Sequence, residues 1–486
     1  MATNNYSLQT TKVRQKPILH VEVRVKSDGD NVIIRTDIIR EDVTKWLIDN
    51  FAILSLGQEL HTLESDLKEP HAQVLESIKV AECTYGEIES GAYHLENVEL
   101  DVQAYQLRVP TESQCPQQNQ NVGEQEKNEI DGPQARIIPL PSKEFDGIWE
   151  SLLFDQPIPS SLLRAITHMV LLSTRGLDTW VINWNRLILL WGPPGTGKTS
   201  LCRGLAQKLA IRLGKHFPRS KLVEIQTHSL GSKFFSESGK LVSKMFETIE
   251  AMLLEEEDTF VCVFIDEVET ITARREQTII GNEPLDAMRA VNTLLTALDR
   301  LRHHINIIVL CTSNLISALV SPNRLIIYDV FQDNAFIDRI DIKQFIPHPN
   351  ATVIYEIYKS CFENLSKCGV IEGLTFDVIQ LNPQDPETPL QYIEHPADRL
   401  ILPSYDEMLI GYQIFPDSIP KQLADVASAS VGLSGRCLRR LPALSLALHT
   451  QNTRCRIHDA LTALHQGVTE EQHAKTETEA LGGSVK

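Results

Sequence analysis

The chain has 486 residues, of which 42% are hydrophobic and 23% charged, as expected for a globular protein of two or three domains. Its 46 Lys and Arg against 64 Asp and Glu give a net charge of −18, which argues against a surface that follows nucleic-acid phosphates. We therefore expect no direct nucleic-acid partner. Nine scattered cysteines without a CxxC pair indicate a reducing compartment. The N-terminus lacks a signal-peptide core and no apolar run reaches about 18 residues, which predicts a soluble protein with no membrane partner.

The first part of the chain is predicted to be a small α/β domain, residues 1–109. Apolar and polar residues alternate over 18–26 and again over 98–102, as in strands with one buried face. Between them, apolar residues recur at three- and four-residue intervals over 43–51, as on a helix with one apolar stripe.

A linker is predicted at residues 110–136. This stretch carries almost no large apolar side chains, so it cannot bury enough surface to offset the entropy of ordering. A mobile tether between a small front domain and a larger body suits a domain that captures and delivers another protein.

The body, residues 137–347, is predicted to be a parallel sheet with helices on both faces, because short apolar strands alternate with helix-length segments. A helix with one apolar face follows Pro284. The expected strands are Leu187–Trp191, Leu222–Gln226, Phe260–Ile265, Ile305–Cys311 and Asp341–Ile346.

Beyond Pro347 the strand pattern stops and helical periodicity takes over, which predicts a helical lid at residues 348–468. Residues 382–403, rich in Pro, Asp, Glu and Gln, are interpreted as an extended loop between lid helices, with no assigned function. The polar residues 469–486 are predicted to be a flexible tail.

A complete P-loop lies directly after a predicted strand and directly before a predicted helix, the context that the motif requires. Its glycines let backbone N–H groups curl around phosphate oxygens, and the helix N-terminus adds its positive dipole end. Lys198 neutralises β/γ charge and Thr199 offers a hydroxyl to Mg²⁺. We therefore expect Mg²⁺ and ATP at this site. The predicted nucleotide-binding residues are Gly192, Pro193, Pro194, Gly195, Thr196, Gly197, Lys198, Thr199 and Ser200.

Two acidic residues end the strand that follows some sixty residues later. Asp266 is predicted to hold Mg²⁺ together with Thr199, and Glu267 to polarise the attacking water as a general base. Asn314 ends the next strand, where its side chain could hold that water near the γ-phosphate. By itself Asn314 could equally be a turn residue or a helix cap, and the P-loop context favours the sensor.

Several stretches resemble the AAA+ superfamily and, within it, the pachytene checkpoint protein 2 family. They are WNRLILLWGPPGTGKTSLCRGLAQKLAIRL, SKFFSESGKLVSKMF, FIDEVETITARR, NEPLDAMRAVNTLLTALD, AFIDRIDIKQFI and GLSGRCLRRLP. The resemblance runs from about Phe145 to Ile346 and returns near Gly432. It implies a hexameric ring that pulls on HORMA-domain proteins together with a HORMA-like adaptor.

The resemblance also assigns two arginines. Arg339 matches the arginine finger that reaches a neighbour's ATP, and Arg436 matches the second sensor, carried by the lid. For a lone arginine a surface salt bridge is the usual alternative, and the motif context favours the functional reading.

A first pore loop is implied at Phe234, Phe235, Ser236, Glu237, Ser238 and Gly239. There an aromatic side chain would grip an extended client, although adjacent aromatics could also be one buried and one half-exposed ring. The family usually has Trp at the position of Phe234, and the change to Phe removes the indole donor. Residues 273–284, with Arg274, Arg275 and Gly281, match a second pore loop or are an ordinary surface loop.

One segment departs from the family. Residues 320–332, VSPNRLIIYDVFQ, lie between Asn314 and Arg339 and widen their spacing from 12 to 25 positions. The residues at its two ends can be encoded by splice-donor and splice-acceptor signals. Our hypothesis is a retained intron or a gene-model error, and transcripts that uniformly contain the segment would contradict it. The alternative is a true surface insertion, which could displace the finger and impair hydrolysis.

The leading interpretation is a hexameric ATPase that remodels HORMA-domain proteins, dismantles mitotic checkpoint complexes and controls meiotic chromosome-axis proteins. Its expected locations are the nucleus and cytoplasm, with chromosomes and kinetochores implied by the resemblance. Two alternatives stay open: a nucleic-acid motor such as a clamp loader, and a scaffold impaired in hydrolysis.

Overall fold

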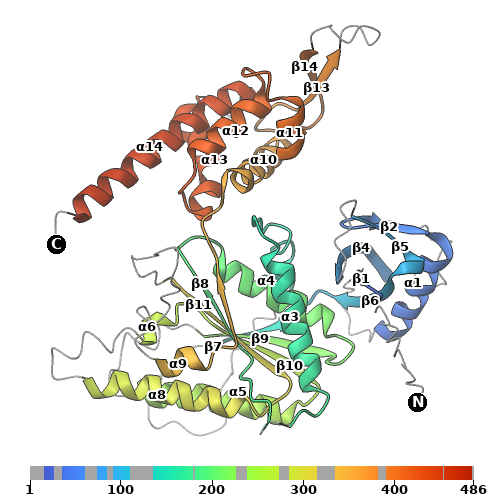
Figure 1. Ribbon diagram of the computed structural model, residues 1–486, viewed down its shortest axis with the longest axis vertical. Coiled ribbons are helices and arrows are strands. Elements are labelled where there is room, and N and C mark those ends of the chain that lie inside the picture. Colours follow the sequence, from blue (N-terminus) through green and yellow to red (C-terminus); the bar gives the residue numbers. More distant parts are fainter. Residues whose placement is uncertain are drawn as a thin grey trace, which may run out of the picture.

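The computed structural model describes residues 16–26, 35–60, 74–84, 91–109, 135–178, 181–225, 238–272, 284–314, 334–380, 390–451 and 454–483. They form an N-terminal α/β domain, a central domain built on a six-stranded sheet, and a mainly helical lid (Figure 1). This agrees with the predicted fold class. The central domain is called the ATPase domain below, after the activity that the sequence predicts for it.

In the described part of the N-terminal domain, helix α1 packs on a four-stranded sheet with the order β3-β4-β1-β6, and β2 pairs with β5 in a separate two-stranded sheet. The central strand β1 pairs antiparallel with β4 and parallel with β6. Its residues Leu19, Val21 and Val23 lie in the core with the apolar side of α1. The elements are β1 (Ile18–Val25), α1 (Thr36–Asn50), β2 (Ile53–Ser55), β3 (Glu59–Leu60), β4 (Leu75–Thr84), β5 (Ala92–His94), η1 (Leu95–Asn97) and β6 (Glu99–Gln106).

The prediction that β1 has only one buried face is wrong. His20 and Glu22, on the polar face, are each only 8% exposed. His20 lies within hydrogen-bonding distance of Asp101 and Thr84, and Glu22 pairs with Lys208 of the ATPase domain. The polar face is therefore buried against a second domain, which a single strand pattern cannot reveal.

The ATPase sheet has the order β12-β8-β11-β10-β9-β7 and is parallel except for β7, which runs antiparallel to β9. Helices cover both faces, as predicted. One face packs against α5, α8 and α9, and the other against α3 and α4. The elements are β7 (Ala135–Leu140), η3 (Lys143–Phe145), α3 (Ile158–Ser173), β8 (Leu187–Trp191), α4 (Lys198–Arg212), β9 (Arg219–Ile225), α5 (Ser238–Glu255), β10 (Thr259–Ile265), α6 (Glu269–Thr272), α8 (Pro284–Leu301), β11 (Ile307–Ser313), α9 (Asn334–Asp338) and β12 (Ile342–Phe345).

All five expected strands of this domain are present, with ends shifted by up to three residues. The sixth strand, β7, begins at Ala135, so its first two residues lie inside the predicted linker at 110–136. Pairing with β9 orders this segment, a contact that lies outside its local sequence.

The described residues of the lid form five helices and one antiparallel pair of strands, and their core is separate from that of the ATPase sheet. The N-cap of its first helix is Asn350, whose side chain accepts a hydrogen bond from the N–H of Val353 at 2.9 Å. The elements are α10 (Ala351–Lys367), β13 (Leu374–Gln380), β14 (Leu390–Pro396), α11 (Tyr405–Gly411), α12 (Ile419–Ala429), α13 (Gly435–His449) and α14 (Ile457–Gly483).

Two predictions for the lid are corrected. Part of the expected loop at 382–403 forms β14, which pairs with β13 and is held by the stacked rings of Phe376 and Tyr392. The tail expected to be flexible from residue 469 continues α14 to Gly483. Polar side chains anchor this helix, since Lys475 donates to the carbonyl of Gly432 at 2.8 Å and Gln472 donates to that of Ala429.

The N-terminal domain is docked on the ATPase domain through charged side chains, mainly at the end of α4. Lys208 donates to Glu22 at 2.6 Å, and both side chains are at most 10% exposed. Arg212 donates to Glu82 at 3.0 Å, and Lys215, just beyond α4, pairs with Asp101.

Within the described part of the chain, no helix combines the length and hydropathy that a bilayer-spanning segment requires.

Candidate active site

The P-loop connects β8 to α4 and has the tight geometry that phosphate binding requires. Gly192 (φ 147°) lies so close to β12 that a Cβ atom there would be 2.3 Å from the carbonyl oxygen of Ile346. Gly195 (φ 73°) faces the lid, where a Cβ atom would lie 2.9 Å from that of Ser434. Only glycine fits these backbone conformations and close approaches. The loop is thus held between the sheet and the lid.

Lys198, the first residue of α4, is buried at the centre of the loop. Its ammonium donates to the carbonyl oxygens of Gly192 at 2.9 Å and Pro193 at 2.6 Å. Burial lowers the pKa of Lys198, while nearby carboxylates, first among them that of Glu269, act in the opposite direction. The ammonium therefore lies inside the P-loop, the kind of loop whose backbone N–H groups bind phosphate oxygens.

Thr199 and Asp266 lie together, as predicted for a magnesium site. The Thr199 hydroxyl lies 3.0 Å and 3.2 Å from the two carboxylate oxygens of Asp266. One hydroxyl and one carboxylate suit Mg²⁺, which prefers oxygen ligands. It usually takes one or two groups from the protein and completes its coordination shell with phosphates and water. No group of three or more His, Cys, Asp or Glu side chains suited to a metal occurs among the described residues.

Glu267 is held in a strained conformation that aims its side chain. Its φ of 52° lies in the left-handed region, which is uncommon for a residue with a side chain and is concentrated at functional sites. The Asn314 amide donates to the Glu267 carboxylate at 3.1 Å. The two residues predicted to handle the attacking water are therefore in direct contact, at the ends of neighbouring strands.

Two residues of this cluster were not predicted from the sequence. The Thr312 hydroxyl donates to Asp266 and accepts from the Glu267 N–H at 3.0 Å, so it orients both acids. Glu269 accepts from the Asn314 N–H at 2.8 Å, and burial raises its pKa. Thr312 could have been predicted, because it is a polar residue at the end of an otherwise apolar strand. No sequence pattern distinguishes Glu269.

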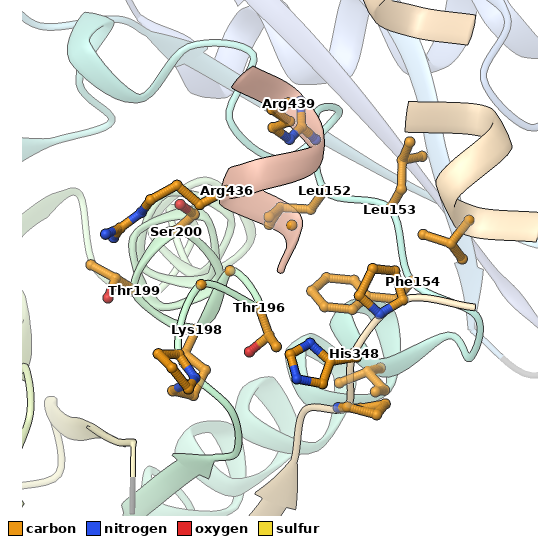
Figure 2. Close-up of a pocket in the computed structure, with 18 of the residues that line it drawn as sticks. Leu152, Leu153, Phe154, Thr196, Lys198, Thr199, Ser200, His348, Arg436 and Arg439 are labelled. Atoms are coloured by element: carbon orange, nitrogen blue, oxygen red, sulfur yellow. The ribbon is translucent and has the colours of Figure 1, made fainter. Parts of the chain in front are cut away.

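The cavity above these residues has a volume of about 620 Å³, within the usual range for small-molecule sites. P-loop residues such as Lys198 and Thr199 line one side, and Leu153 and Phe154 line another (Figure 2). Val353 and Ile357 of the lid add to the apolar part. A polar end for phosphates and an apolar end for a base suit a nucleotide. The sequence did not single out the apolar end.

The lid contributes Arg436 from the first turn of α13, which faces the P-loop (Figure 2). Its backbone N–H donates to the carbonyl of Gly195 at 3.1 Å. Lid and P-loop are thus joined at the cavity, as the second-sensor assignment requires.

Arg339 is placed differently from the other predicted catalytic residues. It follows α9 and is not among the described residues that line the cavity. Phe336, Ile337 and Ile340 around it are buried in the sheet core. Residues 320–332 are not among the described residues, so an effect of this segment on Arg339 and on hydrolysis stays a prediction.

Several predicted segments lie outside the described residues. These are Phe234, Phe235, Ser236 and Glu237 of the first pore loop, residues 273–283 of the second, and the insertion at 320–332. Ser238 and Gly239 form the first residues of α5, and Pro284 the first of α8.

Comparison with known proteins covers all three domains. Residues 188–339 match the family profile described as ATPase family associated with various cellular activities (AAA), residues 14–110 the TRIP13 N-terminal domain, and residues 350–472 the TRIP13-like AAA+ ATPase lid C-terminal domain.

Similar whole proteins point the same way. The chain is 35% identical over 467 residues to the pachytene checkpoint protein 2 homolog of Homo sapiens, covering 94% of each chain, and 35% identical over 460 residues to that of Danio rerio, again 94% of each. The solved structure of C. elegans PCH-2 superposes with a TM-score of 0.64 at 28% identity, covering 94% of this chain and 99% of that one. The chain therefore belongs to the pachytene checkpoint protein 2 (TRIP13) family of AAA+ proteins and is an ATP-hydrolysing enzyme.

Proposed function

We propose that this chain works as a homohexameric, Mg²⁺-dependent motor that remodels HORMA-domain proteins. The ring is inferred from the position of Arg339, which lies apart from the other predicted catalytic residues. Glu267, Asn314 and Arg436 line one cavity, whereas Arg339 lies outside it. An arginine finger held away from its own nucleotide can serve the nucleotide of a neighbour, as in heterologous contacts that close into rings.

The chemistry follows from the contacts in the cavity. Asn314 orients the Glu267 carboxylate, which accepts a proton from the attacking water. Lys198 and the P-loop N–H groups stabilise the phosphate oxygens, and a Mg²⁺ ion held by Thr199 and Asp266 would neutralise phosphate charge. A finger supplied by the next subunit contributes about 10³- to 10⁵-fold in rate, or roughly 4–7 kcal/mol of transition-state stabilisation.

The client follows from family membership. The family resemblance assigns HORMA-domain clients and a HORMA-like adaptor, a role for the N-terminal domain in docking them, and Phe234 and Phe235 as the aromatic grip. In this proposal the enzyme dismantles mitotic checkpoint complexes and regulates meiotic recombination and synapsis, in the nucleus and cytoplasm and at chromosomes and kinetochores.

The test is an ATPase assay on the purified chain with and without a HORMA-domain client and its adaptor. Client and adaptor together should raise turnover. Glu267→Gln removes the general base, which is expected to lower kcat by about 10²- to 10⁴-fold while ATP still binds. The variant should also retain client, since it cannot complete the cycle.

Glu247→Gln is the matched control, because Glu247 is an exposed carboxylate on α5, away from the cavity. Its turnover should equal that of the unaltered chain. Turnover stimulated by DNA and indifferent to HORMA-domain proteins would instead favour a nucleic-acid motor. Full activity in Glu267→Gln would remove this residue from its role.

A further inference from the structure

The guanidinium of Arg339 forms two hydrogen bonds to a carboxylate of the same chain. Nε donates to Oδ1 of Asp299 at 2.8 Å and Nη2 donates to Oδ2 at 2.8 Å. Nη1 also donates to the carbonyl of Ala335 at 2.7 Å. Two parallel N–H···O bonds fix the plane of the guanidinium as well as its position.

The segment that carries Arg339 depends on such contacts for its position. α9 has five residues, far fewer than an isolated helix needs to be stable. Phe336 and Ile337 anchor its backbone in the core, and the Asn185 amide donates to the Arg339 carbonyl at 2.8 Å. These contacts fix the main chain, whereas the side chain is held by the carboxylate of Asp299 and the carbonyl of Ala335.

Asp299 lies on a helix that is itself well anchored, so it can hold the Arg339 side chain in a fixed direction. It lies on the 18-residue helix α8, which is held in the core by Leu294, Leu298 and Leu301 and runs beside α9 (Figure 1). The side chains of Arg339 and Asp299 remain 26% and 39% exposed, so the pair lies at the domain surface, where another subunit can approach. The hydrogen bond from Arg339 lowers the pKa of Asp299, which therefore stays ionised at neutral pH.

We propose that Asp299 is a positioning residue for ATP hydrolysis in the neighbouring subunit, because it holds Arg339 in the orientation in which it enters that subunit's active site. The inference rests on the proposed ring. Without Asp299 the long arginine side chain regains rotamer freedom, and a displacement of about 1 Å at a reacting group can cost about 100-fold in rate. A partly exposed ion pair contributes little to folding, so an effect on turnover can be separated from an effect on stability.

The first experiment is Asp299→Asn, which keeps the shape and removes the charge. We expect kcat to fall by about 10- to 100-fold with little change in the KM for ATP and in Tm, since the defect lies in the transition state. Asp299→Glu, which restores the carboxylate, should recover part of the loss. Asp425→Asn is the matched control, because it removes the carboxylate of another partly exposed ion pair, with Lys421 in the lid, and should leave kcat unchanged.

The second experiment separates a role in the neighbour from a role in the same subunit. Asp299→Asn chains, with an intact cavity and a misplaced finger, are coexpressed with Glu267→Gln chains, with an inactive cavity and an intact finger. In random equal mixtures about one quarter of all sites then combine an intact cavity with an intact finger from the next subunit. Turnover should rise well above that of either variant alone. Coexpression of Asp299→Asn with Arg339→Ala should give no rise, because both chains have a defective finger.

The mixture of Arg339→Ala with Glu267→Gln serves as the reference. If it recovers activity and the Asp299→Asn mixture does not, Asp299 acts within its own subunit and the inference is overturned. If the reference mixture also stays inactive, Arg339 does not act across subunits, and the proposed ring fails along with the role of Asp299. A fall in Tm that accounts for the loss in Asp299→Asn would likewise overturn the inference.

Discussion

The two outer domains are joined to the ATPase domain by different kinds of contact. The N-terminal domain is held by charged side chains, such as Lys208 with Glu22 and Arg212 with Glu82. The lid is held at the nucleotide cavity by backbone contacts and apolar packing. There the Arg436 N–H donates to Gly195, and Leu153 packs against the lid core.

Both junctions involve the same helix. The P-loop and the first residue of α4, Lys198, face the lid across the cavity, whereas Lys208 and Arg212 near its end hold the N-terminal domain. A helix of 15 residues spans about 22 Å as a rigid rod. The two ends of α4 therefore belong to different junctions. We expect nucleotide binding to affect the junction with the lid, and substitutions of charged residues to affect the junction with the N-terminal domain.

The largest effect on the charged junction is expected for Lys208→Met, which leaves Glu22 buried without its cation. Breaking a buried pair in this way costs about 3–5 kcal/mol, so the N-terminal domain should separate from α4. Small-angle scattering should show a larger radius of gyration. In the double variant Glu22→Gln and Lys208→Met, no unpaired charge remains and docking should largely return. Lys421→Met, on an exposed lid pair, is the control. A compact Lys208→Met chain would show that the charges do not hold this junction.

Nucleotide should act on the lid junction. A non-hydrolysable ATP analogue at 100 times its Kd stabilises the state that binds it by about 2.7 kcal/mol. Hydrogen exchange should slow at the start of α13, around residues 434–437, and change little in β1. Lys198→Ala, which weakens phosphate binding, should abolish the protection. Equal protection in β1 would show that α4 transmits nucleotide binding to the N-terminal domain and would erase the distinction between the two junctions.

The smallest effect is expected for Lys79→Gln, at the edge of the charged junction. Lys79 lies 3.3 Å from Glu150, and the two side chains are 31% and 44% exposed. Such a pair contributes about 0.2–1 kcal/mol, and less as salt shortens the Debye length from about 10 Å at 0.1 M to about 3 Å at 1 M. Thermal unfolding should show a small difference from the unaltered chain at low salt that vanishes at high salt. A difference independent of salt would exclude a simple charge effect.

Much of the active site was predictable because phosphate binding depends on contiguous residues. The turn, the backbone N–H groups and Lys198 all belong to one strand–loop–helix segment, so the spacing of a few residues defines the chemistry. Asp266, Glu267 and Asn314 end adjacent parallel strands, and their apolar runs were visible as well. The strands of the ATPase sheet followed from the same runs, apart from the antiparallel β7.

The amino-acid sequence by itself thus determined the family, the order of the domains and the nucleotide chemistry, since these depend on local patterns. Tertiary structure alone decided which side chains support that chemistry and how the domains are joined. Lys208 and Glu22 are 186 positions apart and Arg339 and Asp299 are 40 apart, so no local pattern connects either pair. The energy of an ion pair depends on distance and burial in space, and both arise only when the chain has folded.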